Sequence, residues 1–129
     1  MIDISGILSV GGYSKDRSTE VYMLDTGTTC SFPDLPEGRS YHSLDGLNNK
    51  PILCGGYGED ANAGILTSCL QFTPTSASGV WTNYATTILA RGNHATWVSG
   101  AGLVLMGGDD TTEIVGTGLG NFSLVHQLK

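Results

Sequence analysis

Ile52-Leu53-Cys54-Gly55-Gly56 is a short apolar run that ends in two glycines, and the chain holds two runs like it. They are residues 7–12, Ile-Leu-Ser-Val-Gly-Gly, and residues 103–108, Leu-Val-Leu-Met-Gly-Gly. Gly12 and Gly56 are 44 residues apart, and Gly56 and Gly108 are 52 residues apart. A pattern that returns after about 50 residues indicates a fold built from successive similar units.

Two further motifs return together with the glycine pairs. Arg39-Ser40-Tyr41-His42 and Arg91-Gly92-Asn93-His94 share the pattern Arg-x-x-His, and their arginines are 52 residues apart. Residues 18–21, Ser-Thr-Glu-Val, likewise correspond to residues 111–114, Thr-Thr-Glu-Ile. Because the motifs keep their order in each round, the sequence predicts repeated units, and a period near 50 residues is typical of propellers.

The composition favours short strands over helices. Glycine accounts for 19 of the 129 residues, and no apolar pattern with helical spacing is sustained over three turns. Segments rich in Val, Ile, Tyr and Thr instead alternate with clusters of Gly, Pro, Asp and Asn. The expected strands are residues 7–10, 19–25, 28–32, 40–44, 51–54, 66–72, 80–84, 93–98, 102–106, 112–115 and 121–125.

Charge and hydropathy argue against several classes of partner. The net charge is −6, and the six Lys and Arg residues are scattered, so neither nucleic acid nor an anionic membrane surface is an expected partner. No apolar run approaches the ~18–20 residues of a membrane span. The first residues show no signal-peptide pattern. Both an extracellular and a cytoplasmic location stay open.

The three cysteines are Cys30, Cys54 and Cys69, and their odd number leaves at least one thiol unpaired within the chain. Cys54 and Cys69 fall on strands that we expect to be neighbours, so a disulfide between them is geometrically conceivable. The alternative is three small buried side chains. The sequence does not decide between the two.

Taken together, the motifs resemble the kelch repeat, in which an apolar strand ending in Gly-Gly precedes an aromatic strand, a Trp and an Arg-x-x-His-like start of the next strand. Tyr22 and Phe72 supply the aromatic residue and Trp81 the Trp, whereas Cys30 stands in its place in the first round. The resemblance covers nearly the whole chain. It implies an all-β fold of four-stranded antiparallel propeller blades, each with its first strand lining a central channel. The approximate blades are residues 1–38, 39–90 and 91–129.

The resemblance also implies structural roles for the repeated residues. The glycine pairs would allow backbones to crowd where a strand leaves the packed sheet. Trp81 would fill the space between adjacent blades, and the Arg-x-x-His motifs would tie one blade to the next through hydrogen bonds. The residues with this expected role are Gly11, Gly12, Gly55, Gly56, Gly107, Gly108, Arg39, His42, Trp81, Arg91 and His94.

Counting blades predicts an incomplete propeller arc. Propellers usually close with roughly 4–8 blades, and this chain holds about two complete blades with a partial blade at each end. The first of these lacks its innermost strand. An isolated arc would expose strand edges and sheet faces. We therefore expect the remaining blades of a longer propeller, or self-association, to complete it.

The function expected from the resemblance is a non-catalytic protein–protein interaction scaffold. In kelch proteins the binding face commonly consists of loops that here correspond to residues 13–18, 57–64, 109–111, 33–39 and 85–91. Loops on a rigid scaffold are where recognition residues concentrate, and aromatic and charged side chains contribute most. The candidate binding residues are Tyr13, Lys15, Arg17, Tyr57, Glu59 and Asp60.

Catalysis is disfavoured, because no Ser-His-Asp order stands out. No cofactor or metal is expected either, since His42 and His94 hold equivalent positions in different rounds and not one shared site. The alternative is a scaffold segment of a carbohydrate-active or galactose-oxidase-like propeller enzyme. A third interpretation is an extracellular structural repeat protein, which a Cys54–Cys69 bridge would favour.

Overall fold

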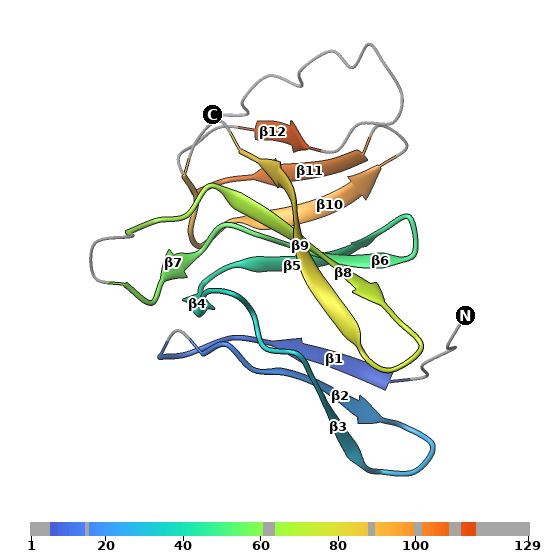
Figure 1. Cartoon of the computed structure of the whole chain (residues 1–129). Helices are drawn as coiled ribbons and strands as arrows, with labels where there is room; N and C mark the ends of the chain where they lie inside the picture. Colours follow the sequence, from blue (N-terminus) through green and yellow to red (C-terminus); the bar gives the residue numbers. More distant parts are fainter. Residues whose placement is uncertain are drawn as a thin grey trace.

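The computed structural model describes residues 6–14, 16–60, 64–87, 90–99, 102–108 and 112–115. In this part of the chain every strand pairing is antiparallel, and no helix occurs. The prediction of an all-β antiparallel fold is therefore confirmed. The sheets follow one another along the chain and are stacked in the same order (Figure 1).

Three sheets contain most of the strands. The first sheet consists of β1 (Gly6–Val10), β2 (Thr19–Met23) and β3 (Thr29–Phe32), in that spatial order. The middle sheet consists of β5 (Ser43–Leu47), β6 (Lys50–Cys54), β8 (Ser68–Pro74) and β9 (Gly79–Thr86). The third sheet consists of β10 (Ala95–Ser99), β11 (Gly102–Met106) and β12 (Thr112–Val115). The short strands β4 (Arg39–Ser40) and β7 (Tyr57–Gly58) form a separate pair.

The middle sheet has the predicted four strands. The first sheet has three, and β1 lies at its edge. The third sheet has three strands among the described residues; the predicted strand at residues 121–125 lies outside them. All three glycine pairs directly follow a strand: β1, β6 and β11 end at the residue before them.

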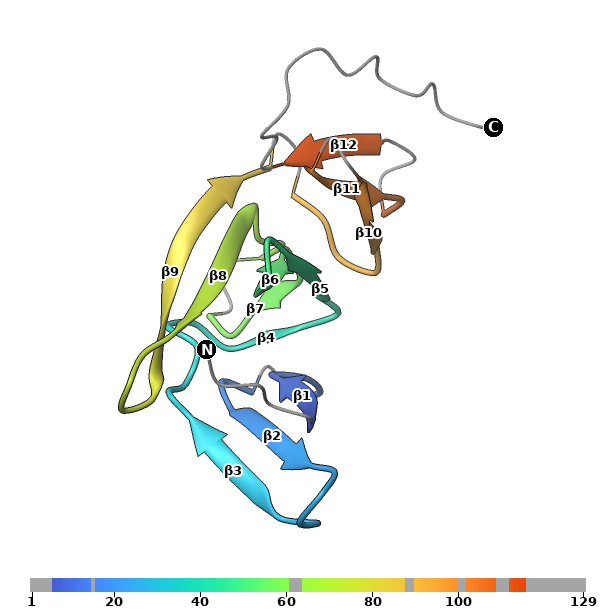
Figure 2. The ribbon, with the colours of Figure 1, turned by 90° about the vertical axis from the view of Figure 1, so that its right-hand side faces the viewer.

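The sheets are stacked (Figure 2). Two apolar cores of buried side chains lie between them. Successive side chains of a strand point to opposite faces, and β6 shows the result. Leu53 packs toward the first sheet, whereas Ile52 and Cys54 pack toward the third. The core between the first and middle sheets contains Val10, Leu35, Leu53, Leu70, Phe72 and Trp81. The core between the middle and third sheets contains Leu47, Ile52, Cys54, Cys69, Leu103 and Leu105.

One turn differs from the prediction. The strand expected at residues 40–44 is in fact two strands, β4 and β5, and β5 continues to Leu47. The turn expected between residues 45 and 50 is present but shorter, because the chain reverses at Asn48 and Asn49, whose φ angles are 53° and 61°. Asn tolerates positive φ better than other side-chain-bearing residues, so this pair accommodates the two-residue hairpin.

Cys54 and Cys69 form a disulfide. The two residues are direct partners in the β6–β8 register, and both side chains are fully buried. Cys30, in contrast, is an exposed free thiol. The interpretation of all three cysteines as small buried side chains is therefore wrong, because two are bonded and the third lies at the surface.

Candidate functional site

The loops that follow the first two glycine pairs meet beside the sheets, at the ends of β1 and β7. Arg17, in the first loop, donates through Nε to Glu59 Oε2 at 2.8 Å and through Nη2 to Glu59 Oε1. This bidentate ion pair joins residues 42 positions apart in the sequence. Its side chains are 48% and 32% exposed, so solvent screens the attraction. Its main effect is to hold the two loops together.

Hydrogen bonds fix the course of the first loop. The Asp16 carboxylate accepts from both the amide and the hydroxyl of Ser18, and these bonds lower the pKa of Asp16. The Asp16 carbonyl accepts from the Arg39 amide at 3.2 Å, and the Arg17 carbonyl accepts from the Leu35 amide at 2.8 Å. Leu35 is 1% exposed. The backbone on both sides of the Arg17 side chain is therefore anchored to the core.

Three tyrosines lie in or next to the segments that follow these glycine pairs. Tyr13 is 89% exposed, whereas Tyr57 is half-buried against Gly92. Tyr41 packs edge-to-face on Tyr57, with ring centroids 5.8 Å apart, and stays 57% exposed. Such rings combine apolar area with a polar hydroxyl, which suits them to contact with another molecule.

Tyr41 is the residue that the sequence analysis missed. Its φ is 55°, a left-handed conformation that an aromatic residue rarely adopts. Asn93, at the same place in the other Arg-x-x-His motif, has the same φ of 55°, and Asn tolerates it. A Tyr where the repeat otherwise has Asn was the available signal, because strained backbone often accompanies a functional site.

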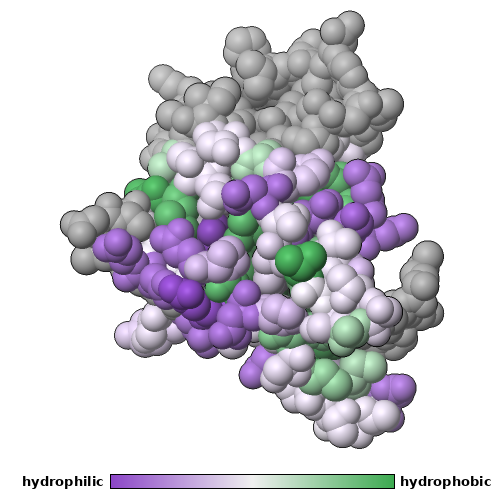
Figure 3. Space-filling view, in the orientation of Figure 1, coloured by the Kyte–Doolittle hydropathy of each residue, from purple (hydrophilic) through white to green (hydrophobic). Residues whose placement is uncertain are grey.

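For the two other predicted binding residues, Lys15 and Asp60, the structure gives no support for a binding role. Lys15 lies outside the described residues. Asp60 is exposed beside Glu59. Hydrophilic side chains gather on the side of the molecule where β7 lies (Figure 3). Arg17 and Glu59 are brought together with each other, and Tyr57 is brought together with Tyr41.

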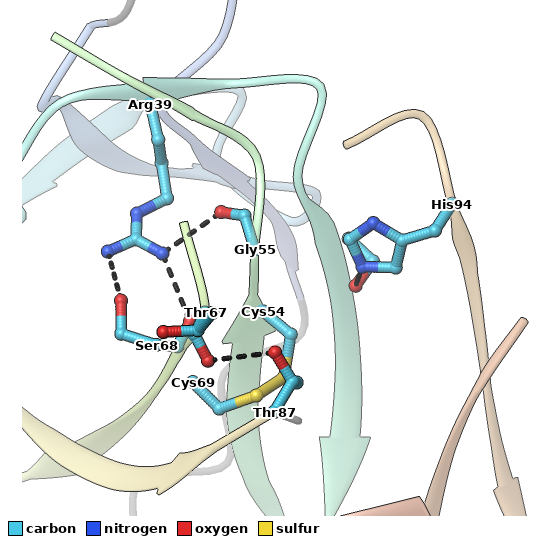
Figure 4. The surroundings of a disulfide bond; sticks show 9 residues. Arg39, Cys54, Gly55, Thr67, Ser68, Cys69, Thr87 and His94 are labelled. Atoms are coloured by element: carbon cyan, nitrogen blue, oxygen red, sulfur yellow. Dashed lines mark hydrogen bonds between the residues drawn. A yellow bond between two sulfur atoms is a disulfide. The ribbon is translucent and has the colours of Figure 1, made fainter. Parts of the chain in front are cut away.

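The arginines of the two Arg-x-x-His motifs are buried connectors between strands. Arg39 donates through Nη1 to the carbonyls of Gly55 (3.0 Å) and Ser68 (3.2 Å), and through Nη2 to Ser68 Oγ at 3.0 Å (Figure 4). Arg91 donates in the same way to the Gly107 carbonyl at 2.6 Å. Both side chains are 1% exposed, and burial lowers the pKa of Arg39.

The backbones of these arginines also bind the preceding glycine pairs. The Gly12 amide donates to the Arg39 carbonyl at 3.1 Å, and the Gly56 amide donates to the Arg91 carbonyl at 2.7 Å. At Gly55, where φ is +66°, an added Cβ would lie 2.4 Å from the Arg91 carbonyl oxygen. Only glycine allows this approach. A series of hydrogen bonds through Arg39 and Arg91 therefore connects the first sheet to the middle sheet and the middle sheet to the third.

The histidines of the motifs lie at the same joints. His94 Nε2 and Ser43 Oγ form a hydrogen bond of 2.8 Å between the third and middle sheets. Burial, followed by the charges of Arg91 and His42, lowers the pKa of His94. Burial likewise lowers the pKa of His42, against which a hydrogen bond with the Val10 backbone acts. Both environments favour the neutral imidazole.

Trp81 lies in the core between the first and middle sheets, where its Nε1 donates to Thr19 Oγ1 at 3.1 Å. The register corrects one alignment made from the sequence. Phe72 pairs with Trp81, and the equivalent Tyr22 pairs with Thr29. Thr29, and not Cys30, therefore holds the position of Trp81 in the first sheet. Cys30 pairs with Val21 and belongs to the opposite face.

The described residues contain no group of three or more His, Cys, Asp or Glu side chains that could hold a metal ion. Within the same part of the chain, no helix is long and apolar enough to cross a bilayer. Comparison with protein-family models finds no match, and no match to a curated protein sequence is found.

Proposed function

We propose that the chain is a non-catalytic protein–protein interaction scaffold of the kelch β-propeller type and that the three sheets are successive, partly incomplete blades. The recurrence of contacts supports the blade assignment. In successive sheets the second glycine binds the next motif arginine, and that arginine reaches the next glycine pair. A repeat whose contacts are themselves repeated behaves as one structural unit.

The observation that carries the binding proposal is the ion pair between Arg17 and Glu59, which links the loops after the first two glycine pairs. Tyr13, in the first of these loops, and Tyr41, packed on Tyr57, expose large aromatic side chains. Interaction surfaces are enriched in Tyr and Arg, and a few such residues carry most of the affinity. The binding surface that we propose consists of Tyr13, Arg17, Tyr41, Tyr57 and Glu59.

Affinity capture with matched variants tests this surface. The bait is the chain itself, and Tyr13→Ala combined with Tyr41→Ala removes the two exposed rings. Tyr22→Ala is the matched control, because Tyr22 is 46% exposed on the first sheet and away from the joined loops. We expect specific partners whose recovery falls at least tenfold with the double variant and stays unchanged with the control. Equal recovery with all baits, at equal thermal stability, would contradict the proposal.

The disulfide favours an oxidising compartment, which the extracellular interpretation requires. Disulfides persist outside the cytosol and are rare within it. The Cys54–Cys69 bond is completely buried, so its function in this proposal is to fasten β6 to β8 within the middle sheet. Mass spectrometry of the natural protein without reductant tests the assignment. A mass with three alkylated cysteines would contradict it.

A further inference from the structure

Gly46 is a glycine that the fold of the middle sheet does not require. It lies within β5 and has no left-handed φ, and no atom of the described residues lies within 4 Å of the Cβ that another residue would have there. Gly46 pairs with Pro51 as Val98 pairs with Leu103, so the equivalent residue of the third sheet is a valine. Neither backbone conformation nor crowding therefore accounts for this glycine.

The residue before Gly46 is an aspartate. Asp45-Gly46 is the one Asp-Gly pair among the 129 residues, and the sequence holds no Asn-Gly pair. The carboxyl carbon of an Asp side chain can be attacked by the amide nitrogen of the next residue, which closes a five-membered imide ring, a succinimide. A side chain on that next residue hinders the attack, whereas glycine has none.

The structure places the two reacting groups in contact. The Gly46 amide nitrogen lies 2.8 Å from Asp45 Oδ1 and donates a hydrogen bond to it. The carboxyl carbon Cγ is one bond away from Oδ1, so it lies close to the same nitrogen. Reacting groups that are already held together have less entropy to lose on the way to the transition state.

The β5–β6 pairing does not compete for the Gly46 amide. The hairpin closes with Leu47 opposite Lys50 and two residues between them, and such a closing pair is hydrogen-bonded. Hydrogen-bonded and non-hydrogen-bonded pairs alternate along an antiparallel ladder. Gly46 and Pro51 are therefore a non-hydrogen-bonded pair, and the Gly46 amide is directed away from β6. Because β5 is the first strand in the order of its sheet, this direction leads out of the sheet as the structure describes it.

The described chain leaves room for the ring. Gly46 is exposed, and Asp45 and Gly46 line a cavity of about 350 Å³ together with Leu8, Leu44 and residues 49–51. Closing the five-membered ring therefore displaces no described neighbour of Gly46, and water reaches the imide from the exposed side.

The backbone at Asp45 lies between two contacts with the third sheet. Leu47 is 6% exposed and belongs to the core between the middle and third sheets. Ser43 Oγ and His94 Nε2 form a hydrogen bond across the same joint, where β5 packs against β10. Both contacts depend on the spacing of residues along β5.

We propose that Asp45-Gly46 is a site of spontaneous succinimide formation and conversion to isoaspartate, and that the product loosens the joint between the middle and third sheets. The Gly46 nitrogen forms a bond to Asp45 Cγ, and the hydroxyl of the protonated carboxyl group leaves with the amide proton as one water. Water then adds to either carbonyl carbon of the ring. Breaking the bond between nitrogen and Cγ restores aspartate, whereas breaking the bond between nitrogen and the original backbone carbonyl carbon gives isoaspartate.

The isoaspartate backbone runs through Cβ and Cγ, so it is one carbon longer, while the charge and mass of the chain are unchanged. The added carbon displaces Leu47 relative to its partner Lys50. Because the register of a strand decides which side chains face the core, Leu47 is withdrawn from its place against the third sheet.

Timed incubation of the full 129-residue chain at physiological pH and temperature tests the site. Mass spectrometry detects the succinimide as the loss of one water, and electron-transfer fragmentation distinguishes isoaspartate from aspartate at each position. We expect isoaspartate at residue 45 to accumulate at least about tenfold faster than at exposed Asp25, which Thr26 follows. The native chain should convert at least as fast as the chain unfolded in urea, because the native contact holds the reacting groups together.

Two chain variants verify the chemistry. Gly46→Ala adds a Cβ that meets no described atom within 4 Å, so it should fold normally but hinder the attack. Asp45→Glu keeps the carboxylate but would have to close a six-membered ring. Both should reduce conversion at residue 45 at least about tenfold. Asp25→Glu is the matched control and should leave conversion at residue 45 unchanged.

Hydrogen exchange tests the effect on the joint. In the separated isoaspartate form we expect the Leu47 amide to exchange at least about tenfold faster than in the unmodified chain, while the amides of β2 in the first sheet keep their rates. Conversion at residue 45 that is no faster than at Asp25, or that is faster in urea than in the native chain, would overturn the proposed site. Equal exchange of Leu47 in both forms would overturn the loosening of the joint.

Discussion

The first and middle sheets share the same repeat but differ at one face. In the middle sheet this is the face that packs on the preceding, first sheet, and in the first sheet it is the equivalent face. On that face the middle sheet carries Leu53, Leu70, Phe72 and Trp81, and all four are buried against the first sheet. The equivalent residues of the first sheet are Ser9, Glu20, Tyr22 and Thr29, and all are exposed. Residues at equivalent positions are therefore apolar where a described sheet packs on them and mostly polar where none does.

The largest expected effect comes from Trp81 and its equivalent Thr29. Trp81→Ala should lower the free energy of unfolding by about 3–5 kcal/mol, because it leaves a cavity between two sheets. Thr29→Ala should change it by no more than about 0.5 kcal/mol, because Thr29 is exposed. Urea denaturation of both variants measures the difference. Similar losses would show that the two faces are equally packed in solution.

The disulfide gives the next effect. Val10 and Thr19 hold in the first sheet the positions that Cys54 and Cys69 hold in the middle sheet. Replacing both Cys54 and Cys69 by Ala should cost about 3 kcal/mol, the value expected for a closed loop of 15 residues. Denaturation with and without reductant measures it. Reductant should destabilise the natural sequence and leave the double variant unchanged; an equal response of both would contradict the assignment.

The second glycine of each pair offers a matched comparison of intermediate size. Gly56→Ala introduces a Cβ 2.6 Å from the Ser40 carbonyl oxygen, whereas Gly12→Ala meets nothing described within 4 Å. Both substitutions carry the backbone cost of a positive φ, and Gly56→Ala adds about 1–3 kcal/mol of overpacking. Thermal unfolding of both variants measures the difference, and equal losses would show that Gly56 is no more crowded than Gly12 in solution.

The smallest effect is a dependence on pH at the two histidine joints. His42 and His94 have lowered pKa values in the folded state, so the unfolded chain binds protons first as the pH falls below about 6.5. Their contribution to stability is complete above that pH and decreases below it, by at most about 1.4 kcal/mol per pH unit for each histidine. His94→Gln should flatten the profile of unfolding free energy between pH 7 and pH 5. An unchanged slope would show that His94 titrates normally when folded.

The sequence predicted the repeat well because its signals are local. Gly-Gly marks the end of β1, β6 and β11, since a left-handed backbone beside another strand requires glycine. The turn before β6 was predicted too long, at residues 45–50, because Asp45-Gly46 also has turn chemistry, and only the register to Leu47 shows that these two residues are paired. The misalignment of Cys30 has the same origin, because a shift of one residue exchanges the faces of a strand.

The site was predicted less completely. Glu59 follows a glycine pair, so its loop position could be inferred, whereas Tyr57 lies in the short strand β7 and not in the predicted loop. The Arg17–Glu59 pair could not be inferred, because it depends on how two loops 42 residues apart are aimed. Tyr41 was missed because it lies within a motif assigned to structure, and its exposure follows from a φ of 55° that no composition rule predicts.

The hydrogen bond from Trp81 to Thr19 also imposes an order of events during synthesis. The two residues are 62 positions apart, so the first sheet is complete in sequence long before the side chain that covers its inner face exists. At about 5–20 residues per second, the ribosome needs roughly 3–12 s to extend the chain from Thr19 to Trp81. During that interval the apolar face of Leu8 and Val10 gains partners from its own chain one after another, first Leu35, then Leu53 and Leu70, and Trp81 last. The core between the first and middle sheets is therefore incomplete until β9 has been made.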